Sequence, residues 1–509
     1  MPVLPQRVLN FSTPTVHTVK SLVLESTNKW CKHDGKDMNI IRPTGESGMS
    51  RPEPPNVLIV GAGIAGLFLA ILLERQKVPY TIYERAKEPK PIGSAIGLDV
   101  KIMPVMEQLG LLEELKSISL PGAGVEMFDP QLKFMTAILF KGYEEVTGYV
   151  PLMFPRPELH RLLRSHVPVE KIIYSKKVLS LEQNDHGAML RMSDGTTVHG
   201  DIVVGADGTY SGVRQGLYKH LEKKDLLPAS DREELTLGHL CMVGTTNPVD
   251  PEKYPCVNNE KALFQRVIGK GDPYTWHTVN MRGNKICWGI ICQMDSTVAS
   301  RDKLFRNSDW GSEGDEGVMS GAFDKPTPIG GTVRDLFEAT PKEEISKVFL
   351  EEKLFETWYY GRTVLIGDAC HKFLPSAGQG AVNAMQDAVV LANRIYEMGE
   401  ATPENITAAF KEYRDERYGP AKRLMAKSKL LAILQYGMTW RDRLIRYIMF
   451  NLIPNGIKMK QFYKDTMHRP QVSYLEYVEA HGTGEVLPQK PSKRYAQEKA
   501  AAKGEEVAS

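Results

Sequence analysis

One segment, VLIVGAGIAGLFLAILLER at residues 57–75, constrains the fold of this chain more than any other part of it. Its first four residues, Val57–Val60, are all apolar with β-branched ends, which is typical of a strand buried on both faces. From Ile64 to Leu73 the apolar residues follow helical spacing instead. A second apolar strand is expected at Tyr80–Tyr83, so this stretch predicts a β-α-β unit.

Three glycines separate the predicted strand from the predicted helix, and each has its own role in a dinucleotide-binding loop. Gly61 permits a tight turn, Gly63 lets a pyrophosphate approach the backbone, and Gly66 allows the helix to pack closely on the strand. The helix N-terminus also presents unpaired N–H groups to the phosphates. Glu84, 18 residues after Gly66, ends the second strand, where its carboxylate can accept the hydrogens of a ribose diol. The segment therefore predicts dinucleotide binding.

The bulk composition of the 509 residues excludes some classes of protein. Lys and Arg number 64 against 62 Asp and Glu, a net charge of +2, so no nucleic-acid partner is predicted. The six cysteines form no CxxC pair and are too sparse for a disulfide framework, which favours a reducing compartment. No run of about 18 apolar residues predicts a transmembrane helix. We expect a cytoplasmic protein.

Residues 1–55 are expected to form a disordered or variable N-terminal extension. The first 50 are polar, rich in Ser and Thr, and lack the basic start and apolar core of a secretory signal. A mitochondrial transit peptide is the less favoured alternative. Pro52, Pro54 and Pro55 cannot lie inside a helix or a central strand, so the folded unit begins after them.

Further along the chain the pattern changes twice. Between about 235 and 295 the apolar residues alternate over longer segments, and Gly283-Asn284 separates two aromatic-containing strands as the turn of a hairpin. Helical spacing returns from 405 to about 434, with Pro403 suited to the first helical turn. The shorter elements expected are a helix at 100–118 and strands at 178–181, 188–192 and 197–204.

Two later motifs complete the pattern. DIVVGADGTYSGVR, at 201–214, is an apolar strand that delivers Asp207-Gly208, and GDACHKFLPSAGQGAVNAMQDA, at 367–388, is a dense turn before an Ala- and Val-rich helix. Together with the first segment they resemble the three fingerprints of the single-component, FAD-dependent aromatic hydroxylases, the para-hydroxybenzoate hydroxylase group, over residues 56–420. The resemblance is closest to fungal members that oxidise aromatic or prenylated secondary metabolites.

The resemblance implies an α/β fold. It consists of a Rossmann-like, three-layer (β-β-α) FAD-binding domain, an inserted antiparallel-sheet substrate domain and a C-terminal helical region. The boundaries we expect are 56–230 and 331–400 for the two parts of the FAD-binding domain, 231–330 for the mainly antiparallel substrate sheet, 401–485 for the helical region, and 486–509 for a disordered tail.

The third motif would hold the flavin end of FAD. In such proteins Asp368 would bind the ribityl or ribose hydroxyls, and Pro375 would stand beside the isoalloxazine. The backbone at Gly378, Gly380 and Ala381 would lie against the pyrimidine edge of the ring, where the helix N-terminus stabilises negative charge.

Other parts of the chain are expected to contact FAD by their matching positions. Asp207 would face the pyrophosphate and also affect binding of the nicotinamide cofactor. Gly97 and Arg156 are the further expected contacts, with Arg161 as the alternative to Arg156.

The implied activity is that of a monooxygenase. The sequence shows one dinucleotide fingerprint only, so NADPH or NADH has no Rossmann domain of its own. In the family it docks transiently, reduces the flavin and leaves, and dioxygen then gives a flavin hydroperoxide that transfers one oxygen atom. We expect hydroxylation or epoxidation of a hydrophobic aromatic or isoprenoid small molecule, with the protein orienting the cofactor and excluding water.

The catalytic residue, if any, stays unassigned. Arg214 and Tyr210 are the candidates beside the second motif, with a purely structural role as the alternative. Cys370-His371 has no second His/Cys cluster at ligand spacing, so no metal site is predicted. Trp276 and Trp288 either belong to the sheet core or line a substrate pocket.

Two alternatives to this function stay open. One is a flavin oxidase or dehydrogenase that never consumes NAD(P)H, and the other is a non-catalytic flavin-binding interaction protein.

Residues 440–460, WRDRLIRYIMFNLIPNGIKMK, mix arginines with a dense apolar face. Charges interrupt the segment too often for it to span a bilayer, but a basic amphipathic stretch can lie on one, so the protein can be peripheral to an intracellular membrane. Packing on the flavin domain or on a dimer partner is the favoured alternative. The chain is expected to be a monomer or a homodimer.

Overall fold

The computed structural model describes residues 54–508 apart from 91–92, 270–272, 294–318 and 438. Nearly all of the expected N-terminal extension, residues 1–53, lies outside the described residues.

A six-stranded sheet carries the first glycine motif near its centre. The strand order is β17-β18-β11-β1-β2-β7, and all neighbours are parallel except β17 and β18. Every residue of the two central strands β1 and β11 is buried, as their unbroken apolar sequences predict. The strands are β1 (Val57–Val60), β2 (Tyr80–Tyr83), β7 (Ile172–Ile173), β11 (Ile202–Gly205), β17 (Tyr359–Tyr360) and β18 (Thr363–Leu365).

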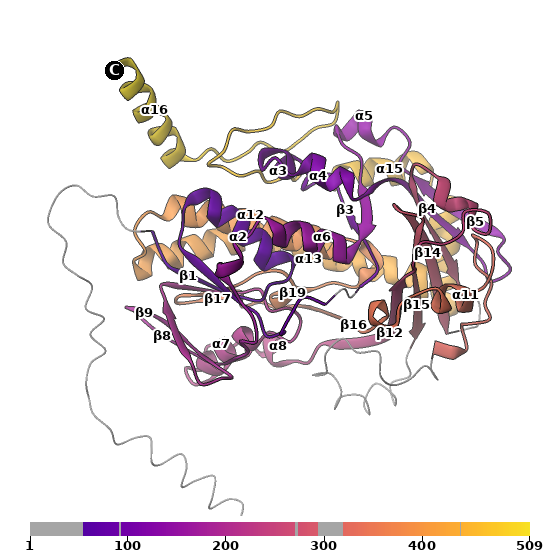
Figure 1. The fold of residues 1–509 in the computed structure, drawn as a ribbon, viewed down its shortest axis with the longest axis horizontal. Helices are drawn as coiled ribbons and strands as arrows, with labels where there is room; N and C mark the ends of the chain where they lie inside the picture. The colour runs from indigo at the N-terminus through magenta and orange to yellow at the C-terminus, as the bar shows by residue number, and fades with distance from the viewer. Residues whose placement is uncertain (1–53, 91–92, 270–272, 294–318, 438, 509) are drawn as a thin grey trace, which may run out of the picture. The chain divides into compact units, whose positions relative to one another are not determined.

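Helices cover one face of this sheet, and a small antiparallel sheet with one helix covers the other (Figure 1). Side chains of all three layers belong to one hydrophobic core, which confirms the predicted three-layer α/β fold. The helices on the first face are α2 (Ile64–Gln76), α6 (Arg156–Ser165) and α12 (Gly380–Met398). The other face carries β8 (Val178–Asn184), β9 (Gly187–Met192), β10 (Thr197–Gly200) and α7 (Gly212–Glu222).

A second, ten-stranded sheet contains the predicted hairpin, which turns at Gly283 and Asn284, both with positive φ. The sheet is not confined to residues 231–330, because it recruits strands from 95–155 and from 346–372. Its order is β19-β16-β12-β15-β14-β13-β4-β6-β3, with β5 beside β4. The strands are β3 (Ala95–Leu98), β4 (Leu120–Phe128), β5 (Phe134–Leu139), β6 (Leu152–Pro155), β12 (Thr236–Thr245), β13 (Ala262–Ile268), β14 (Tyr274–Met281), β15 (Lys285–Gln293), β16 (Ser346–Leu354) and β19 (His371–Lys372).

Two predicted elements are each split in the structure. The helix expected at 100–118 is two short helices, α3 (Met103–Gln108) and α4 (Leu112–Ser117), because Gly110 between them has φ +73°. The strand expected at 197–204 is β10 followed by β11, which belong to different sheets. The chain changes sheet at Asp201, whose carboxylate accepts a hydrogen bond of 2.9 Å from the backbone N–H of Asn56.

The C-terminal region begins with the predicted long helix, α13 (Pro403–Tyr436), which Thr402 caps by accepting from the backbone N–H of Asn405. It continues through α14 (Trp440–Tyr447), a π-helical turn (Ile448–Leu452) and α15 (Asn455–Lys464). Within the described ranges, no helix combines the length and the apolarity that crossing a membrane requires. The remaining short helices are α5 (Tyr143–Thr147), α8 (Ala229–Arg232) and α11 (Val333–Glu338).

The predictions for the last 45 residues are wrong in two respects. Residues 465–485, expected to belong to the helical region, form no regular helix, and the tail expected to be disordered, 486–509, contains helix α16 (Lys493–Ala508). This tail has an Ala-rich sequence with high helix propensity. Its first turns are attached to α12, since Tyr396 donates to Glu498 at 2.5 Å and Arg494 donates to the Tyr396 carbonyl at 2.8 Å.

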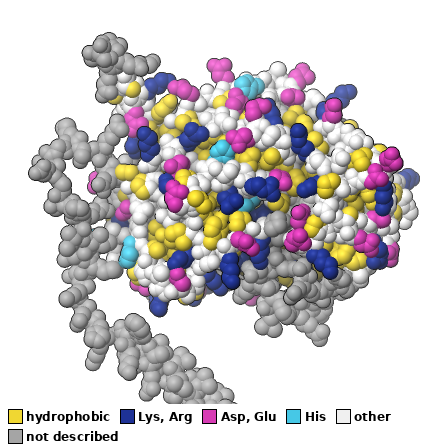
Figure 2. Space-filling view, in the orientation of Figure 1, with side chains coloured by type: hydrophobic (Ala, Val, Ile, Leu, Met, Phe, Trp, Pro, Cys, Tyr) yellow, Lys and Arg dark blue, Asp and Glu magenta, His cyan; other side chains and the backbone are white. Residues whose placement is uncertain are grey.

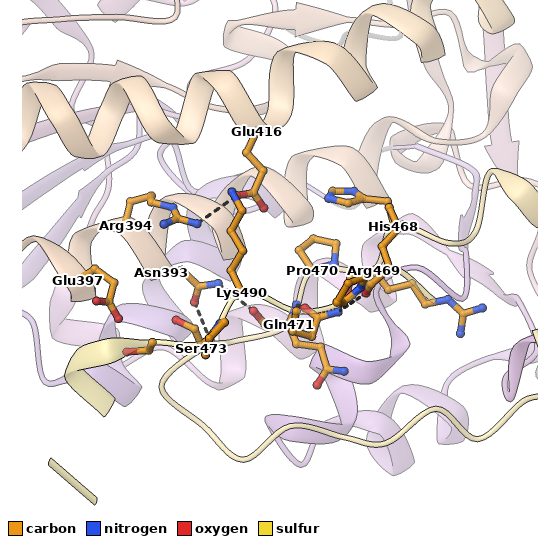
Figure 3. A pocket seen from close by; sticks show the side chains of 15 residues that line it. Asn393, Arg394, Glu397, Glu416, His468, Arg469, Pro470, Gln471, Ser473 and Lys490 are labelled. Atoms are coloured by element: carbon orange, nitrogen blue, oxygen red, sulfur yellow. Dashed lines mark hydrogen bonds and ion pairs between the residues drawn. The ribbon is translucent and has the colours of Figure 1, made fainter. Parts of the chain in front are cut away.

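The segment 468–492 lies along α12 and α13 and forms with them a cavity of about 230 Å³, most of whose lining residues are polar or charged (Figure 3). Asn393 of α12 binds this segment twice, donating to the carbonyl of Gln471 and accepting from the N–H of Ser473. Lys490 pairs with Glu416 of α13 at 3.0 Å. These contacts hold the C-terminal segment on the C-terminal half of α12.

On the face shown in Figure 2, basic and acidic side chains are interspersed.

Candidate functional site

The first glycine loop has the geometry that its sequence predicts. Gly61 has φ +106°, and a Cβ there would lie 2.5 Å from the carbonyl oxygen of Ala206. A Cβ at Gly66 would lie 2.0 Å from the carbonyl oxygen of Gly61, so helix α2 sits directly on the turn. A Cβ at Gly63 would meet no atom within 4 Å. Two glycines are therefore required by the fold, whereas Gly63 leaves open space in front of the backbone.

Two side chains fix this loop from outside. Glu84, at the end of β2, accepts hydrogen bonds of 2.8 Å from the backbone N–H groups of Ala62 and Ala86, one on each carboxylate oxygen. His160 of α6 lies 2.8 Å from the Ala62 carbonyl. Burial lowers the pKa of His160, so the ring is neutral and donates from Nε2. His160 was not predicted from the sequence, because a single His on a helix gives no pattern.

Residues of the second motif form the N-terminal cap of the helix that follows it. Ser211 donates to Asp207 at 2.5 Å, and its hydroxyl accepts from the backbone N–H of Arg214 to begin α7. Burial raises the pKa of Asp207, although its bonds with Ser211 and with the N–H of Val213 act in the opposite direction. Asp207 lies beside the first loop, since a Cβ at Gly61 would be 2.9 Å from its Cα atom.

The third motif is anchored to both other loops. Arg214, which is 6 % exposed, donates to the carbonyl of Ala369 at 2.9 Å and to that of Thr209 at 2.7 Å. Gly367 has φ +61°, and a Cβ there would lie 3.3 Å from Cβ of Ala65 in α2. The three loops, residues 61–66, 207–214 and 367–381, therefore meet, and we call them the cofactor loops.

Asp368 in the third loop is surrounded by cations. Lys372 donates to it at 2.5 Å, and Thr209 donates at 3.4 Å. Burial alone would raise the pKa of Asp368, but the charges of Lys372, His371 and Arg156 together hold it below its ordinary value. The carboxylate is therefore ionised and accepts hydrogen bonds.

The last part of the third loop is exposed backbone. Pro375 is exposed and begins a short 3₁₀ turn that ends at Gly378, with φ +62°. Helix α12 then starts at Gly380, and no side chain caps its first N–H groups. A Cβ at Gly378 or Gly380 would meet no atom within 4 Å, and Ala381 is half-buried. This edge of the loop leaves open space beside the unpaired donors of a helix N-terminus.

Comparison with known proteins decides which family has these loops. A family model described as an FAD binding domain matches residues 55–230 and 332–428, more than half of the chain. The chain belongs to this FAD-binding family. Two curated relatives are the FAD-dependent monooxygenases ptmM of Penicillium ochrochloron and pyr5 of Aspergillus fumigatus. They are 28% and 30% identical over 392 and 390 residues, covering 75% and 72% of this chain and 89% and 79% of the relatives.

Solved structures show the same fold. HpxO of Klebsiella pneumoniae, complexed with FAD and uric acid, matches with a TM-score of 0.65 at 19% identity, covering 81% of this chain and 97% of that one. The 2,6-dihydroxypyridine-3-hydroxylase of Arthrobacter nicotinovorans matches with a TM-score of 0.59 at 20% identity, covering 76% and 95%. The curated relatives and the family model confirm the resemblance given by the three motifs, and the chain is a member of the FAD-dependent monooxygenase family.

The cofactor loops fit FAD on two observations. Gly63, Gly378 and Gly380 leave open space beside the backbone, which lets a phosphate or a flat ring approach it. The uncapped N-termini of α2 and α12 offer N–H groups to anionic or carbonyl oxygens.

The expected contacts outside the loops fall into two groups. Arg156 lies close enough to Asp368 for the two charges to shift each other's pKa, although burial lowers the pKa of Arg156 first. Arg161, the alternative, is exposed and pairs with Glu158 on the surface of α6. Gly97 lies in β3, where a Cβ would be 2.8 Å from the sulfur of Met153.

A polar group next to Gly97 was not predicted. Lys101 donates to the amide oxygen of Gln379 at 2.5 Å, and the amide nitrogen of Gln379 donates to Asp99 at 2.9 Å. Gln379 immediately precedes α12, so this group supports the uncapped helix end from the side of β3. Its members are 280 residues apart in sequence, which is why no local pattern shows it.

The two catalytic candidates have structural contacts. Arg214 connects the second and third loops, as described above, and its guanidinium lies 4.1 Å from the centre of the Phe355 ring. The hydroxyl of Tyr210 donates to Glu351 of β16 at 2.6 Å. These contacts support the structural alternative for both residues.

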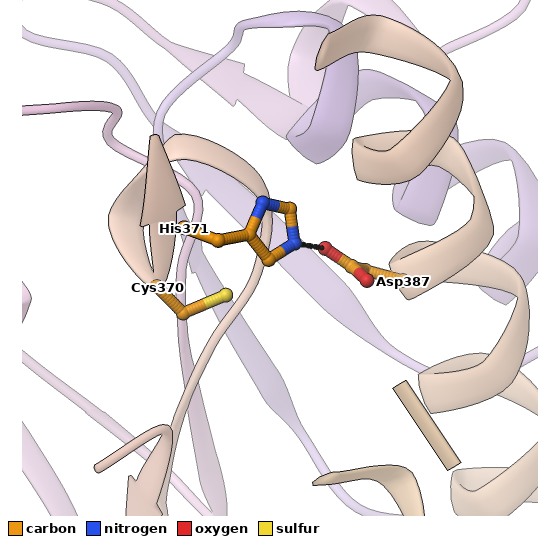
Figure 4. Close-up of side chains that lie close together, drawn as sticks. All are labelled: Cys370, His371 and Asp387. Atoms are coloured by element: carbon orange, nitrogen blue, oxygen red, sulfur yellow. Dashed lines mark hydrogen bonds and ion pairs between the residues drawn. The ribbon is translucent and has the colours of Figure 1, made fainter. Parts of the chain in front are cut away.

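Cys370 and His371 of the third loop lie close to Asp387 of α12 (Figure 4). Their ligand atoms are within 4.8 Å of one another, a spacing at which one metal ion could be shared by the three side chains. Asp387 already binds His371 at 2.6 Å, Arg417 at 2.8 Å and the N–H of Gly367 at 3.0 Å, and burial raises the pKa of the Cys370 thiol. The arrangement thus braces the loop through hydrogen bonds, and the absence of a metal stays a prediction.

The large sheet presents a polar cluster toward the third loop. Arg266 of β13 and His277 of β14 are register partners, and Arg266 lies over the ring of Tyr436 at the end of α13. Arg266 also donates to the side chain of Gln435, which donates to the carbonyl of Ser376 at 3.1 Å. We call Arg266, His277, Gln435 and Tyr436 the polar cluster; each is at most 8 % exposed.

The polar cluster has unused hydrogen-bonding groups. In the part of the chain that the structure describes, Arg266 Nε, His277 Nδ1 and the Tyr436 hydroxyl have no hydrogen-bond partner, and Arg266 forms no ion pair. Burial, followed by the charge of Arg266, lowers the pKa of His277 to about 3. Apolar side chains surround the cluster, namely Cys241, Ile291, Leu350, Leu374 and Ala432.

The two tryptophans lie on the opposite face of this sheet. Trp288 donates to Thr340 at 2.8 Å and Trp276 to the carbonyl of Pro326 at 2.9 Å, and both belong to a core that includes α11. Both are therefore part of the sheet core.

Proposed function

We propose that this FAD-dependent monooxygenase uses NAD(P)H and dioxygen to hydroxylate or epoxidise a hydrophobic aromatic or isoprenoid small molecule. The observation that supports this most is the meeting of the three cofactor loops opposite the polar cluster. Gln435, which belongs to that cluster, donates to the carbonyl of Ser376, the residue after Pro375. A ring held beside Pro375 would therefore face the sheet surface that can receive a substrate.

Each loop would hold one part of FAD. Gly63 and the N-terminus of α2 would bind the pyrophosphate beside Asp207, and Glu84 would accept from a ribose diol. Asp368, ionised and flanked by Arg156, would accept from ribityl or ribose hydroxyls. When bound, FAD would supply the redox chemistry, namely acceptance of a hydride from NAD(P)H and activation of dioxygen.

The N-terminus of α12 is proposed to stabilise negative charge at the flavin edge. Its N–H groups from Gly380 and Ala381 onward have no side-chain cap, and a helix N-terminus carries about half a positive elementary charge. These groups are preorganised, because Asp387 in the same helix fixes the preceding loop at Gly367.

The polar cluster is proposed to orient the substrate. Arg266 and the hydroxyl of Tyr436 would donate to an oxygen of the substrate, while the surrounding apolar side chains would pack on its carbon skeleton and exclude water. His277 stays neutral near pH 7, because its pKa lies at about 3, and burial raises the pKa of Tyr436. The cluster therefore binds an oxygen as donors, without proton exchange from His277.

A reducing compartment is proposed for the protein, with the cytoplasm as its location. Its support is that the five cysteines of the described residues, Cys241, Cys256, Cys287, Cys292 and Cys370, are all free thiols. Whether the protein acts as a monomer or a homodimer can be measured by sedimentation.

The test is a turnover experiment on the purified, FAD-loaded protein. Hydrophobic phenolic and isoprenoid compounds are screened for stimulation of NAD(P)H oxidation, with dioxygen uptake and the oxygenated product measured together. Stimulated oxidation with one oxygen atom in the product supports the proposal. Reduction of the flavin by substrate alone, without NAD(P)H, assigns the oxidase or dehydrogenase alternative. Purified protein that binds no FAD overturns the proposal.

A further inference from the structure

The segment that follows α13 carries an exposed apolar surface. On α14, Trp440, Leu444 and Tyr447 are 66 %, 50 % and 57 % exposed, and their spacing of four and three residues places them on one helix face. Exposed apolar side chains continue through the π-helical turn into α15, where Ile448, Leu452 and Ile457 are 39 %, 61 % and 62 % exposed. These six residues, Trp440, Leu444, Tyr447, Ile448, Leu452 and Ile457, form what we call the 440–457 surface.

Helix α14 departs from the usual arrangement, in which charged side chains face water and apolar ones face the core, because one of its arginines is buried while its apolar side chains are exposed. Arg446 is 7 % exposed and points inward, donating to the carbonyls of Leu434 and Gly437 at 2.7 Å each. A capping box between Thr439 and Asp442 fixes the first turn of the helix. The orientation is thus set by specific bonds, and packing on the rest of the described chain does not account for the exposed face.

The charged residues around this surface indicate which kind of partner it binds. Arg441, Arg443 and Lys460 are exposed, and Asp442, engaged in the capping box, is the one acidic residue in 440–464 of the sequence. In a twofold dimer the surface would meet its own copy and place these cations opposite one another. An anionic bilayer matches both features, because basic side chains bind its headgroups and Trp and Tyr favour the membrane–water interface.

We propose that the 440–457 surface docks on an anionic lipid bilayer, with its apolar side chains at the boundary between headgroups and acyl chains. The surface is tied through Arg446 to the end of α13, which carries Gln435 and Tyr436 of the polar cluster. Docking therefore brings the bilayer near the substrate face of the sheet, and this last consequence rests on the proposed function. An isoprenoid substrate dissolved in the bilayer would then diffuse only a short distance to the substrate face of the enzyme.

Vesicle flotation of the full-length, FAD-loaded protein tests the docking without any turnover. The protein is mixed with vesicles of phosphatidylcholine alone or with about 30 % phosphatidylserine. We expect flotation with the anionic vesicles, weakened by salt because the cations contribute. The variant Leu444→Ser/Leu452→Ser/Ile457→Ser is expected to bind at least about tenfold more weakly, since it removes the apolar groups that enter the bilayer.

A matched control removes three equally exposed apolar side chains elsewhere. Val169, Leu179 and Leu226 are 74 %, 60 % and 55 % exposed, so Val169→Ser/Leu179→Ser/Leu226→Ser changes surface hydrophobicity to a similar extent. Its vesicle binding is expected to equal that of the unchanged protein. The variant Arg441→Gln/Arg443→Gln/Lys460→Gln is expected to lose about tenfold on anionic vesicles and nothing on neutral ones. It also tests the proposal if the serine variant fails to fold.

Three results overturn the proposal. The unchanged protein remains with the unbound fraction on anionic vesicles; the matched control loses as much binding as the 440–457 variant; or sedimentation shows a dimer that the 440–457 variant converts to a monomer, which assigns the surface to a second copy. FAD content and thermal unfolding of each variant show that it is folded. A protein that floats but never turns over would refute the proposed reaction and leave the docking intact.

Discussion

The cofactor loops and the polar cluster face each other, but they are built in opposite ways. The loops use backbone: Gly61 and Gly66 shape the turn, and the N–H groups of α2 and α12 remain free. The polar cluster uses side chains: Arg266 and Tyr436, buried on an apolar surface, keep unused hydrogen-bonding groups. A backbone site needs particular small residues at fixed spacing, whereas a side-chain site needs only that distant residues meet. The first kind is visible in a sequence and the second is not.

The largest expected effects come from the glycines, and they separate fold from binding. Gly66→Ala is expected to destabilise the protein by about 3 kcal/mol, because its Cβ would overlap the backbone of Gly61. Gly63→Ala is expected to leave stability unchanged, since no atom lies near its Cβ, but to weaken FAD binding about 100-fold by blocking the pyrophosphate. Thermal unfolding of the apoprotein and flavin titration measure the two quantities.

Gly419→Ala in α13 is the control, because apart from its chain neighbours its Cβ would make ordinary contact only, with Arg423 at 3.6 Å. It is expected to change stability by less than about 1 kcal/mol, since the gain of Ala over Gly in a helix is opposed by crowding against Pro420, and to leave FAD binding unchanged. Equal loss of FAD by the variants at Gly63 and Gly419 would show that the first loop is not a phosphate site.

The polar cluster should make the protein sensitive to acid. An unfolded His binds a proton below about pH 6.5, whereas burial and Arg266 hold the pKa of folded His277 at about 3. The unfolded state therefore binds more protons in this window, and stability falls as the pH falls from about 6.5 toward 3. His277→Phe is expected to remove a few kcal/mol of this dependence, measured as unfolding free energy against pH.

The matched control for that measurement is His186→Phe, since His186 lies exposed in the turn between β8 and β9. Its pH profile should follow that of the unchanged protein. If His277→Phe follows it too, the buried ring does not carry the acid sensitivity.

Substitution of Arg266 is expected to change stability and activity in opposite directions. A buried cation without a carboxylate partner is costly, and an apolar replacement of similar volume is often stabilising. Arg266→Met is expected to raise the free energy of unfolding by about 1 kcal/mol while lowering substrate-stimulated turnover about tenfold. Loss of stability by more than about 2 kcal/mol would instead mean that Arg266 is part of the structural core.

The smallest effect distinguishes two arginines of the same helix. Arg156→Gln is expected to weaken FAD binding about tenfold, because it removes the cation beside Asp368. Arg161→Gln is expected to change FAD binding by less than about twofold, because its partner Glu158 is on the same exposed helix face. Flavin titration of both variants measures the difference, and a reversed order would assign the contact to Arg161.

The same distinction explains how much of the molecule the sequence predicts. The strand-glycine-helix order of residues 57–75 and the hairpin at Gly283 depend on local backbone preferences, and the structure contains both. The strand expected at 197–204 fails because Asp201 alone separates β10 from β11, and so short an interruption does not show in the sequence that the chain changes sheet. Arg266 and Gln435 are 169 residues apart, and neither belongs to a motif.

The C-terminal tail, residues 486–509, shows a different limit of prediction from sequence. Its charged, Ala-rich sequence suits both a disordered segment and a helix, and short helices depend on tertiary contacts for stability. Here the contact between Tyr396 of α12 and Glu498 supplies an attachment that composition cannot reveal.

One unbroken helix, α12, joins the flavin loop to the end of the chain. Its first residue, Gly380, lies where the ring is expected, and Asp387, about two turns later, braces the loop. Asn393, further along the helix, binds Gln471 and Ser473. Truncation of the protein before Gln471 would remove the contacts that hold the C-terminal half of α12. A truncated protein is therefore expected to bind less FAD and to be less yellow, although every residue expected to contact FAD is still present.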